Sequence, residues 1–263
     1  MLKPLTIPVT SELVQIADVQ IEVQRRGSGR PVLLLPGEDG LEVESPFLEQ
    51  LAANHEVTLF WPPGFGLSNR PEWVTMDDVA YLYLDVVKRL GLEGVPVIGC
   101  SMGGWVALEM ATKSETVFAK MALVDPYGIK IGGPMQRDIA DIYAVHPEKI
   151  AALKWADPTR GERRLPERSE EELYIIARNI ESTARLCWEP YMHNPKLRRR
   201  LHRVAVPTLF IWGEQDGMVS VDYGRAYAAG VPGSSLVTIP NAGHLPHIEQ
   251  TQAFFAALNP FLA

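Results

Sequence analysis

Short, uninterrupted runs of apolar residues recur along this chain of 263 residues and constrain its fold more than any other feature. The clearest runs lie at residues 32–35, 57–60, 95–98, 119–124 and 208–212, and a weaker one lies at 235–239. Strands buried on both faces of a parallel sheet have this composition. Helical periods fall between the runs, at residues 46–53, 76–90, 105–113, 221–229 and 252–262. The alternation predicts an α/β fold with a mostly parallel, doubly wound sheet and helices on both faces.

Residues 19–24 have a different pattern, because apolar and polar side chains alternate there. A glycine-rich turn follows at 27–29. This alternation is typical of a strand with one face exposed to solvent. We therefore expect an antiparallel strand at the edge of the sheet, and about eight strands in total.

One long stretch, residues 127–204, contains no strand-like run. It has charged helical patterns at 135–143, 147–155 and 170–186, separated by proline and glycine. The chain is therefore predicted to form one core domain from residues 1–126 and 205–263. Residues 127–204, called the insertion below, are predicted to be a helical segment placed after the sixth strand.

Composition limits the class of protein. A net charge of −7 gives no general attraction to nucleic acid or to an anionic membrane. Two cysteines, Cys100 and Cys187, are too few for a disulfide framework, and no segment approaches the roughly 20 apolar residues of a membrane helix. Residues 1–15 lack the pattern of a secretory leader. We expect a cytoplasmic monomer or homodimer that acts on a small molecule, with no nucleic-acid or membrane partner.

The segment 97–105 carries the clearest chemical signal. An apolar strand runs into the pattern Gly-x-Ser-x-Gly, centred on Ser101, and then into a helix. A sharp strand-to-helix turn needs small neighbours, which Gly99 and Gly103 provide. It exposes the serine hydroxyl at a helix N-terminus, where free N–H groups favour developing negative charge. This context indicates a nucleophile.

From about residue 19 to residue 262 the sequence resembles the α/β-hydrolase family, of the capped serine-hydrolase type. Besides Ser101, the resemblance rests on residues 209–216, which end in Asp216, on Asn-Ala-Gly-His ending in His244, and on the glycine-rich turn 62–68. The order Ser, Asp, His is the order that this fold uses. It implies that His244 takes the proton of Ser101 and that Asp216 orients the imidazole.

Other residues compete for two of these roles. Asp125, Glu214 and Asp222 are alternative acids, and Asp125 ends the strand before the insertion, where some relatives carry theirs. His247 lies three residues after His244 and is the alternative base. The histidines lack metal-ligand spacing, so no metal site is expected.

The loop that would stabilise an oxyanion departs from the family pattern. The backbone N–H groups of Met102 and Glu38 are the expected donors. Relatives usually begin this loop with His-Gly, whereas this chain reads Leu-Pro-Gly-Glu-Asp at residues 35–39. We expect the carboxylates of Glu38 and Asp39 to point away from the site, because they would oppose an oxyanion. The alternative is that they help to bind a cationic group of the substrate. Trp61 stands where relatives commonly have an aspartate.

In this family a helical insertion at this place forms a cap over the nucleophile. Its aromatic and apolar side chains are the expected substrate contacts, namely Trp155, Trp188, Tyr191 and Met192. The leading function is hydrolysis of a small to medium carboxylic ester through an acyl-enzyme, without a cofactor. A lactonase or a carbon–carbon bond hydrolase would use the same three residues. A ligand receptor that keeps the fold without turnover is a further alternative.

Overall fold

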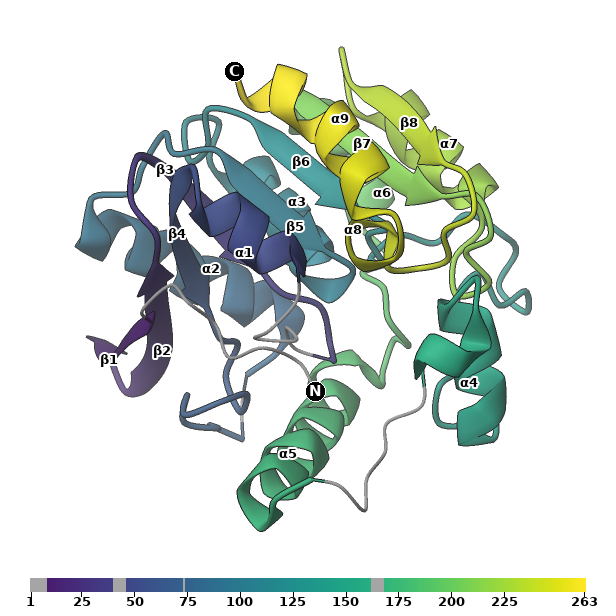
Figure 1. The fold of residues 1–263 in the computed structure, drawn as a ribbon, viewed down its shortest axis with the longest axis horizontal. Helices are drawn as coiled ribbons and strands as arrows, with labels where there is room; N and C mark the ends of the chain where they lie inside the picture. Colours follow the sequence, from purple (N-terminus) through teal and green to yellow (C-terminus); the bar gives the residue numbers. More distant parts are fainter. Residues whose placement is uncertain (1–8, 40–45, 73, 162–167) are drawn as a thin grey trace.

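The computed structural model describes residues 9–39, 46–72, 74–161 and 168–263. At its centre lies an eight-stranded sheet in the order β1-β2-β4-β3-β5-β6-β7-β8 (Figure 1). The strands are β1 Val9–Ile16, β2 Val19–Arg26, β3 Arg30–Leu35, β4 His55–Phe60, β5 Val97–Cys100, β6 Met121–Val124, β7 Thr208–Gly213 and β8 Ser235–Ile239. The predicted fold class is confirmed.

Six neighbouring strands, from β4 through β3 to β8, pair in parallel. β1 and β2 form an antiparallel hairpin, and β2 joins the sheet antiparallel to β4. The central strands β5, β6 and β7 are buried at every residue. Their uninterrupted apolar sequences follow from this position, since helices cover both faces.

Helices pack on the two faces of the sheet (Figure 1). Their bounds are α1 Pro46–Ala52, α2 Met76–Leu90, α3 Met102–Lys113, α7 Val221–Gly230, α8 Pro246–Glu249 and α9 Thr251–Leu262. α1, α8 and α9 lie on one face, where the ring of Phe47 contacts those of Phe254 and Phe255. α2, α3 and α7 lie on the other. This is the doubly wound arrangement that the alternating pattern predicts.

The insertion lies between β6 and β7 and contributes no strand of the sheet among its described residues. It contains α4 Pro147–Lys154, η1 Pro158–Gly161, α5 Glu170–Cys187, α6 Leu197–Arg200 and η3 Leu201–Arg203. Figure 1 places α4 and α5 beyond one end of the sheet, away from the helices that cover its faces. None of the described helices combines the length and apolar character needed to cross a membrane.

The helix expected at residues 135–143 is wrong. This stretch forms turns, and Ile139 makes an isolated bridge with Val219. The carboxylate of Asp138 accepts hydrogen bonds from the backbone N–H groups of Ile131 and Gly132 and pairs with Lys130 at 2.6 Å. Aspartate side chains compete in this way with helical hydrogen bonding, so the local loop is favoured.

Several short or exposed elements do not appear in the sequence prediction, among them β1 and α8. β1 is missed because only Val14 and Ile16 of its eight residues are buried, so it has little apolar pattern. α8 has only four residues, too few for a helical period. Residues 1–8, part of the stretch judged not to be a leader, lie outside the described residues.

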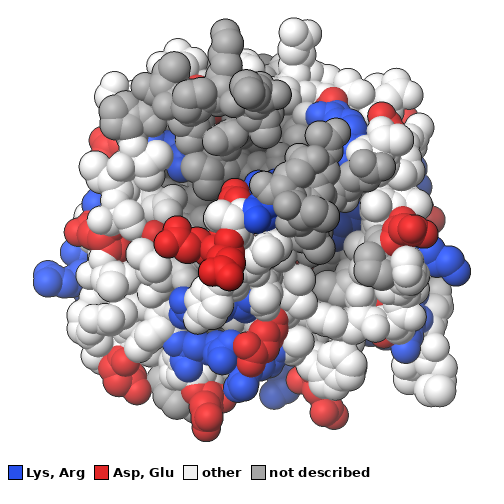
Figure 2. Space-filling model, turned by 60° about the horizontal axis from the view of Figure 1, so that its bottom comes forward, with Lys and Arg blue, Asp and Glu red and all other residues white. Residues whose placement is uncertain are grey.

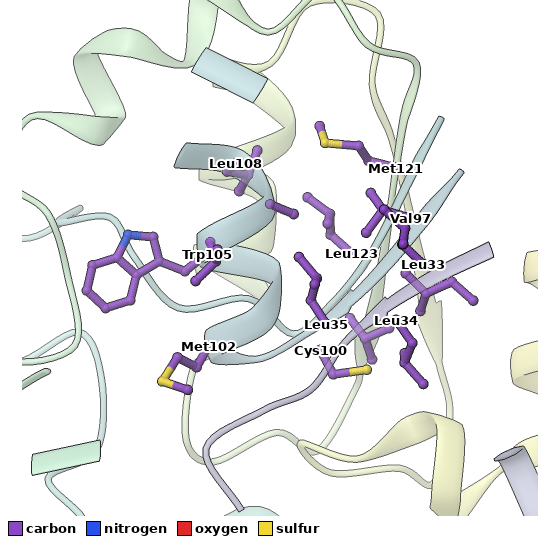
Figure 3. Packing of buried hydrophobic residues seen from close by; sticks show 14 of the residues in the cluster. Leu33, Leu34, Leu35, Val97, Cys100, Met102, Trp105, Leu108, Met121 and Leu123 are labelled. Atoms are coloured by element: carbon purple, nitrogen blue, oxygen red, sulfur yellow. The ribbon is translucent and has the colours of Figure 1, made fainter. Parts of the chain in front are cut away.

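The helix α3 packs against the middle of the sheet. Figure 3 shows Leu35 and Leu123 between α3 and the strands, whereas Trp105 and Met102 point away from them. At its start α3 approaches β3 so closely that a side chain on Gly103 would overlap the carbonyl oxygen of Leu35. A residue larger than glycine at 103 would therefore push the helix away from the strand.

Replacing this glycine tests the close approach. Gly103→Ala is expected to lower the free energy of unfolding by about 1–3 kcal/mol, the usual cost of overpacking. Urea unfolding followed by circular dichroism measures the change. Gly133→Ala is the matched control, because a Cβ there meets no atom within 4 Å. Equal midpoints for the two variants would contradict the packing argument.

Candidate active site

Ser101 lies on the turn between β5 and α3, with φ 49° and ψ −113°. This backbone conformation is strained for any residue with a side chain. The turn is held by the hydrogen bond from the N–H of Ser101 to the carbonyl oxygen of Val124, at 2.8 Å. Such strain persists only where the surroundings enforce it, and here the glycines on either side allow β5 and α3 to meet.

Ser101, His244 and Asp216, called the triad below, form a continuous hydrogen-bonded chain. Nε2 of His244 lies 2.9 Å from Oγ of Ser101, and Nδ1 lies 2.7 Å from Oδ2 of Asp216. Three loops bring them together: those after β5, β7 and β8. The side chains of His244 and Asp216 are wholly buried. The structure therefore joins all three residues that the sequence singles out.

Backbone groups fix the orientation of the acid and the imidazole. Oδ1 of Asp216 accepts hydrogen bonds from the N–H groups of Met218 at 2.7 Å and Val219 at 3.1 Å. The ring of His244 stacks on that of Tyr127, with centroids 5.0 Å apart. These contacts leave Nε2 directed at Ser101, as proton transfer requires.

Most of the alternative residues lie elsewhere. Glu214 is exposed and accepts a hydrogen bond from Thr238, while Asp222 pairs with Arg225 on the surface of α7. His247 is buried against Phe47, and burial together with the charge of His244 lowers its pKa to about 3. It is a neutral packing residue, separate from the hydrogen-bonded chain.

Asp125 is the exception, since it lies beside the triad. Its backbone is left-handed, with φ 44°, and its Oδ1 accepts a hydrogen bond from the N–H of Gly213 at 3.0 Å. Ligand atoms of Asp125, Asp216 and His244 lie within 4.8 Å of one another. Burial and then the charge of Asp216 raise the pKa of Asp125 well above its ordinary value. The buried position of Asp125 beside Asp216 therefore favours its protonated form.

In the described part of the chain, this cluster is the only group of three such side chains spaced to hold a metal ion. The hydrogen bond between Nδ1 of His244 and Asp216 already uses two of the donor atoms. A metal there would have to break the bond that orients the imidazole. That hydrogen bond joins Asp216 and His244, whereas Asp125 is held by the N–H of Gly213.

The carboxylate of Glu38 does not point away from the site, so the expectation for this residue is wrong. Oε2 accepts a hydrogen bond from Oγ of Ser101 at 2.7 Å. Oε1 is bonded by Nζ of Lys154 at 2.7 Å and by the hydroxyl of Tyr127 at 3.2 Å. Lys154 also pairs with Asp39, whose side chain is partly exposed. The ammonium group neutralises the buried carboxylate and so permits it to face inward.

Met102 follows Ser101 in the chain, and Glu38 reaches Ser101 through its side chain; the backbone N–H groups of these two residues are the expected oxyanion donors. Neither donates a hydrogen bond to an acceptor among the described residues. Two free amides beside a nucleophile suit a developing oxyanion. Next to them, Sγ of Cys187, at the end of α5, lies 3.8 Å from Sδ of Met102.

The end of α4 is fastened to the loop that carries the imidazole. The N–H of His244 donates to the carbonyl oxygen of Lys154 at 2.7 Å. Glu249 of α8 accepts hydrogen bonds from the N–H groups of Gly243 and Ala156. Lys154 therefore contacts the loop after β3 through its side chain and the loop after β8 through its carbonyl oxygen.

The four predicted pocket residues make mainly structural contacts. The hydroxyl of Tyr191 donates to the carbonyl oxygen of Ala140 and accepts from the N–H of Ile142, each at 2.9 Å. Met192 is fully buried, Trp188 is 58% exposed, and the guanidinium of Arg160 lies over the ring of Trp155. No contact recorded for these four reaches Ser101 or His244 within the described residues. Their role in substrate binding stays a prediction.

Trp61 stands where relatives commonly have an aspartate, and in this structure a carboxylate from another strand contacts the glycine-rich turn that follows. The buried carboxylate of Glu22, on β2, accepts a hydrogen bond from the N–H of Leu67 at 2.6 Å. Ser68 donates to the carbonyl oxygen of Trp61 and accepts from the N–H of Glu22. Glu22 thus supplies a carboxylate to the glycine-rich turn.

Figure 2 shows acidic and basic side chains on the end of the molecule that carries α4 and α5. A groove of about 440 Å³ lies against α5 and is lined by Arg70, Tyr174, Ala177, Arg178 and Glu181. It contains no residue of the triad, and the Arg70–Glu181 ion pair in its lining satisfies both charges. We assign it no role in catalysis.

Lys154 and Tyr127 are the site residues that sequence reasoning missed. Lys154 is 116 positions from Glu38 and belongs to a helix with an ordinary charged pattern. The only usable signal is the pair of carboxylates, Glu38 and Asp39, in the loop after β3, where relatives usually have His-Gly. A carboxylate that is buried requires a partner, so this pair indicates that a basic residue lies nearby. Nothing in the sequence indicates which of the chain's 25 Lys and Arg residues that partner is.

Comparison with known proteins agrees with the fold. Residues 32–258 match the alpha/beta hydrolase family, and the chain belongs to that family. It is 25% identical to the 2-hydroxy-6-oxo-6-phenylhexa-2,4-dienoate hydrolase of Burkholderia cepacia, over 94% of this chain and 93% of that one. It is 29% identical to the serine hydrolase BPHL of Homo sapiens, over 97% and 87%. The solved 2-hydroxy-6-oxo-6-phenylhexa-2,4-dienoate hydrolase from Rhodococcus sp. strain RHA1 has the same fold, with a TM-score of 0.75 at 21% identity, over 97% and 99%.

The raised pKa of Asp125 predicts a measurable effect on stability. Because its pKa is raised in the folded state, its contribution is fully present below the unfolded pKa of about 3.9 and is lost as the pH rises through the folded value. Asn cannot lose this proton and tolerates positive φ. The Tm of Asp125→Asn relative to wild type is therefore expected to increase between pH 4 and pH 8, by about 2–4 °C for each kcal/mol.

Differential scanning calorimetry at both pH values measures this difference. Asp222→Asn, on the exposed surface of α7, is the matched control. A Tm difference for Asp125→Asn that is the same at pH 4 and pH 8 would show that Asp125 does not carry the extra proton.

Proposed function

We propose that this chain is a serine hydrolase that cleaves a small to medium carboxylic ester through an acyl-enzyme on Ser101. The observation that carries the proposal is the hydrogen-bonded chain from Oγ of Ser101 through His244 to Asp216, with steps of 2.9 and 2.7 Å. A serine is a poor nucleophile until a base takes its proton. An imidazole held by a buried carboxylate is such a base.

In the proposed reaction, Oγ of Ser101 attacks the carbonyl carbon while Nε2 of His244 takes the hydroxyl proton. The oxyanion accepts hydrogen bonds from the N–H groups of Met102 and Glu38. The tetrahedral intermediate then expels the alcohol, which receives the proton from His244. Water, deprotonated in turn by His244, attacks the acyl-enzyme, and the acid leaves as Ser101 regains its proton.

We propose that the insertion is the cap of this hydrolase and that it sets the range of substrates. Its position supports this role, because α4 and α5 lie beyond the end of the sheet that carries Ser101 (Figure 1). Cys187 and Lys154 reach from it to the neighbours of Ser101. An acyl group with an apolar portion would then lie between the sheet and the insertion.

A second candidate function is cleavage of a carbon–carbon bond next to a ketone. It is favoured by the likeness to the hydrolase from Burkholderia cepacia, which extends over almost the full length of both chains. The same triad would serve, since both reactions pass through attack on a carbonyl. The two candidates differ in the leaving group, which is an alcohol in one case and a carbon atom that must be protonated in the other.

A fluorophosphonate probe is expected to label wild-type protein at Ser101 alone, because only an activated serine attacks it. Ser101→Ala is expected to abolish labelling and to lower kcat for p-nitrophenyl butyrate by about 10⁴-fold or more. Asp216→Asn is expected to lower kcat by about 10⁴-fold, since the imidazole would lose its orienting acid. Mass spectrometry of the labelled peptide and release of p-nitrophenol are the measurements.

Glu214→Gln is the matched control for Asp216→Asn, because it removes a nearby carboxylate that has no contact with His244. It is expected to retain kcat within about twofold, as surface substitutions usually do. Wild-type protein that neither reacts with the probe nor cleaves esters, lactones or diketones would refute the hydrolase and favour a ligand receptor of the same fold.

Parallel kinetics decide between the two candidate reactions. Wild-type protein is given p-nitrophenyl butyrate and, separately, 2-hydroxy-6-oxo-6-phenylhexa-2,4-dienoate, the substrate in the name of the bacterial relative. We expect kcat/KM for the ester to exceed that for the dienoate by at least about 100-fold, a difference of about 2.7 kcal/mol in transition-state binding. The opposite ratio would assign the chain to carbon–carbon cleavage.

A further inference from the structure

Glu38 and His244 compete for the hydroxyl of Ser101. Oγ lies 2.7 Å from Oε2 of Glu38 and 2.9 Å from Nε2 of His244. A serine hydroxyl has one hydrogen, so it can donate to only one of these atoms. The other atom must supply a hydrogen of its own, because otherwise two lone pairs would face each other at hydrogen-bonding distance.

The surroundings of Glu38 decide which atom carries that hydrogen. The carboxyl group is buried, and burial alone would raise its pKa. The charges of Lys154 and His244 and the hydrogen bonds from Lys154 and Ser101 outweigh burial and hold the pKa of Glu38 at about 2. Glu38 is therefore ionised at neutral pH, and its oxygens can only accept hydrogen bonds.

The remaining hydrogen then belongs to His244. If Ser101 donates to the carboxylate of Glu38, Nε2 of His244 must donate to Oγ of Ser101. Nδ1 of the same ring faces a second acceptor, Oδ2 of Asp216, at 2.7 Å. Both ring nitrogens are then protonated, and an imidazolium cannot act as a base.

We propose that Glu38 is a positioning residue that holds the hydroxyl of Ser101 on its own carboxylate, so that the free enzyme rests with His244 as an imidazolium. Catalysis begins when a substrate displaces this carboxylate from Ser101. The inference rests on the proposed function and adds a resting state to it. Lys154 belongs to the mechanism, because its ammonium group keeps Glu38 ionised and in place.

Leaving the resting state releases one proton. The hydrogen on Nε2 of His244 passes to solvent, and the hydroxyl of Ser101 turns from Glu38 to the freed Nε2. The carboxylate of Glu38 keeps its ion pair with Lys154. No covalent bond between heavy atoms forms or breaks in this step, and the site then has the proton arrangement that attack on a carbonyl requires.

Other charged or titratable groups also face this centre, and they must be separated from Glu38 in any pH experiment. Around Glu38 and His244 lie Lys154, Asp39, Asp125, Asp216, His247, Tyr127, Tyr143, Tyr191, Cys100 and Cys187. Burial raises the pKa of the thiols and phenols and lowers that of His247 to about 3. A change in the charge of Asp125 could shift the pH dependence of activity in the same way as a change at Glu38, so Asp125→Asn serves as a further variant in the pH experiment.

Nitrogen-15 NMR tests the resting state directly and without turnover. At pH 7, wild-type protein is expected to show both ring nitrogens of His244 protonated, and Glu38→Gln is expected to show a neutral ring with Nε2 unprotonated. His244→Gln identifies the signals. A neutral ring in the wild type would overturn the proposal, and this measurement stands even if Glu38→Gln does not fold.

Kinetics provide the second readout. Removing the negative charge of Glu38 disfavours the imidazolium, so the acid limb of kcat/KM for p-nitrophenyl butyrate in Glu38→Gln is expected to move to lower pH, by about one unit or more. At pH 6 this corresponds to about a tenfold rise in kcat/KM. Asp39→Asn removes the other carboxylate on Lys154 but leaves the contact between Glu38 and Ser101, and it is expected to shift the limb by less than half as much.

The variants separate the possible failures. Equal shifts of the acid limb of kcat/KM in Glu38→Gln and Asp39→Asn would assign the effect to general electrostatics. A shift of the acid limb that occurs only in Asp125→Asn would assign that limb to Asp125. Either result overturns the role of Glu38. Labelling by the fluorophosphonate at the same rate and with the same pH dependence in wild type and Glu38→Gln would also overturn it, while leaving the proposed hydrolase intact. Absence of labelling in both proteins would refute the hydrolase itself.

Discussion

The close approach of α3 to β3 is the constraint on which the site depends. Gly103 has no side chain, so the first turn of α3 lies directly against the carbonyl oxygen of Leu35. This contact brings the loop after β3 next to the strained turn at Ser101 and so places Glu38 within hydrogen-bonding distance of the serine. Parallel pairing adds the loops after β7 and β8, because the carboxyl ends of parallel strands share one edge of the sheet.

The sheet and the hydrogen-bonded chain of the site could be predicted because each depends on a short-range signal. The buried strands are recognisable by their apolar runs, and Gly-Cys-Ser-Met-Gly fixes its own turn through the glycines. His244 and Asp216 were identified through the resemblance to the α/β-hydrolase family, because residues 209–216 and 241–244 resemble the segments that carry its acid and its histidine. Elements without a strong local pattern were not predicted, such as β1, which buries only two side chains.

The inward position of Glu38 was beyond prediction for a physical reason. From the sequence, a carboxylate beside an oxyanion is unfavourable, and that argument is correct for an unpaired charge. Lys154 changes the balance, because a charge paired in the interior costs far less than one left alone. The partner comes from a helix of the insertion, and the contact depends on how α4 lies beyond the end of the sheet. The false helix at 135–143 fails for a related reason: Asp138 binds backbone groups six and seven residues away.

The carbonyl oxygen of Lys154 has a consequence for how the insertion and the core can be recombined. This oxygen accepts a hydrogen bond from the N–H of His244, so the segment around α4 helps to hold the loop that carries the imidazole. Exchanging the insertion for that of another hydrolase would remove this support together with the counter-ion of Glu38. A chimaera would recover both only if residues 241–249 and the loop after β3 were transferred with it. The insertion is therefore coupled to two further segments of the core, and the three segments are discontinuous in the chain.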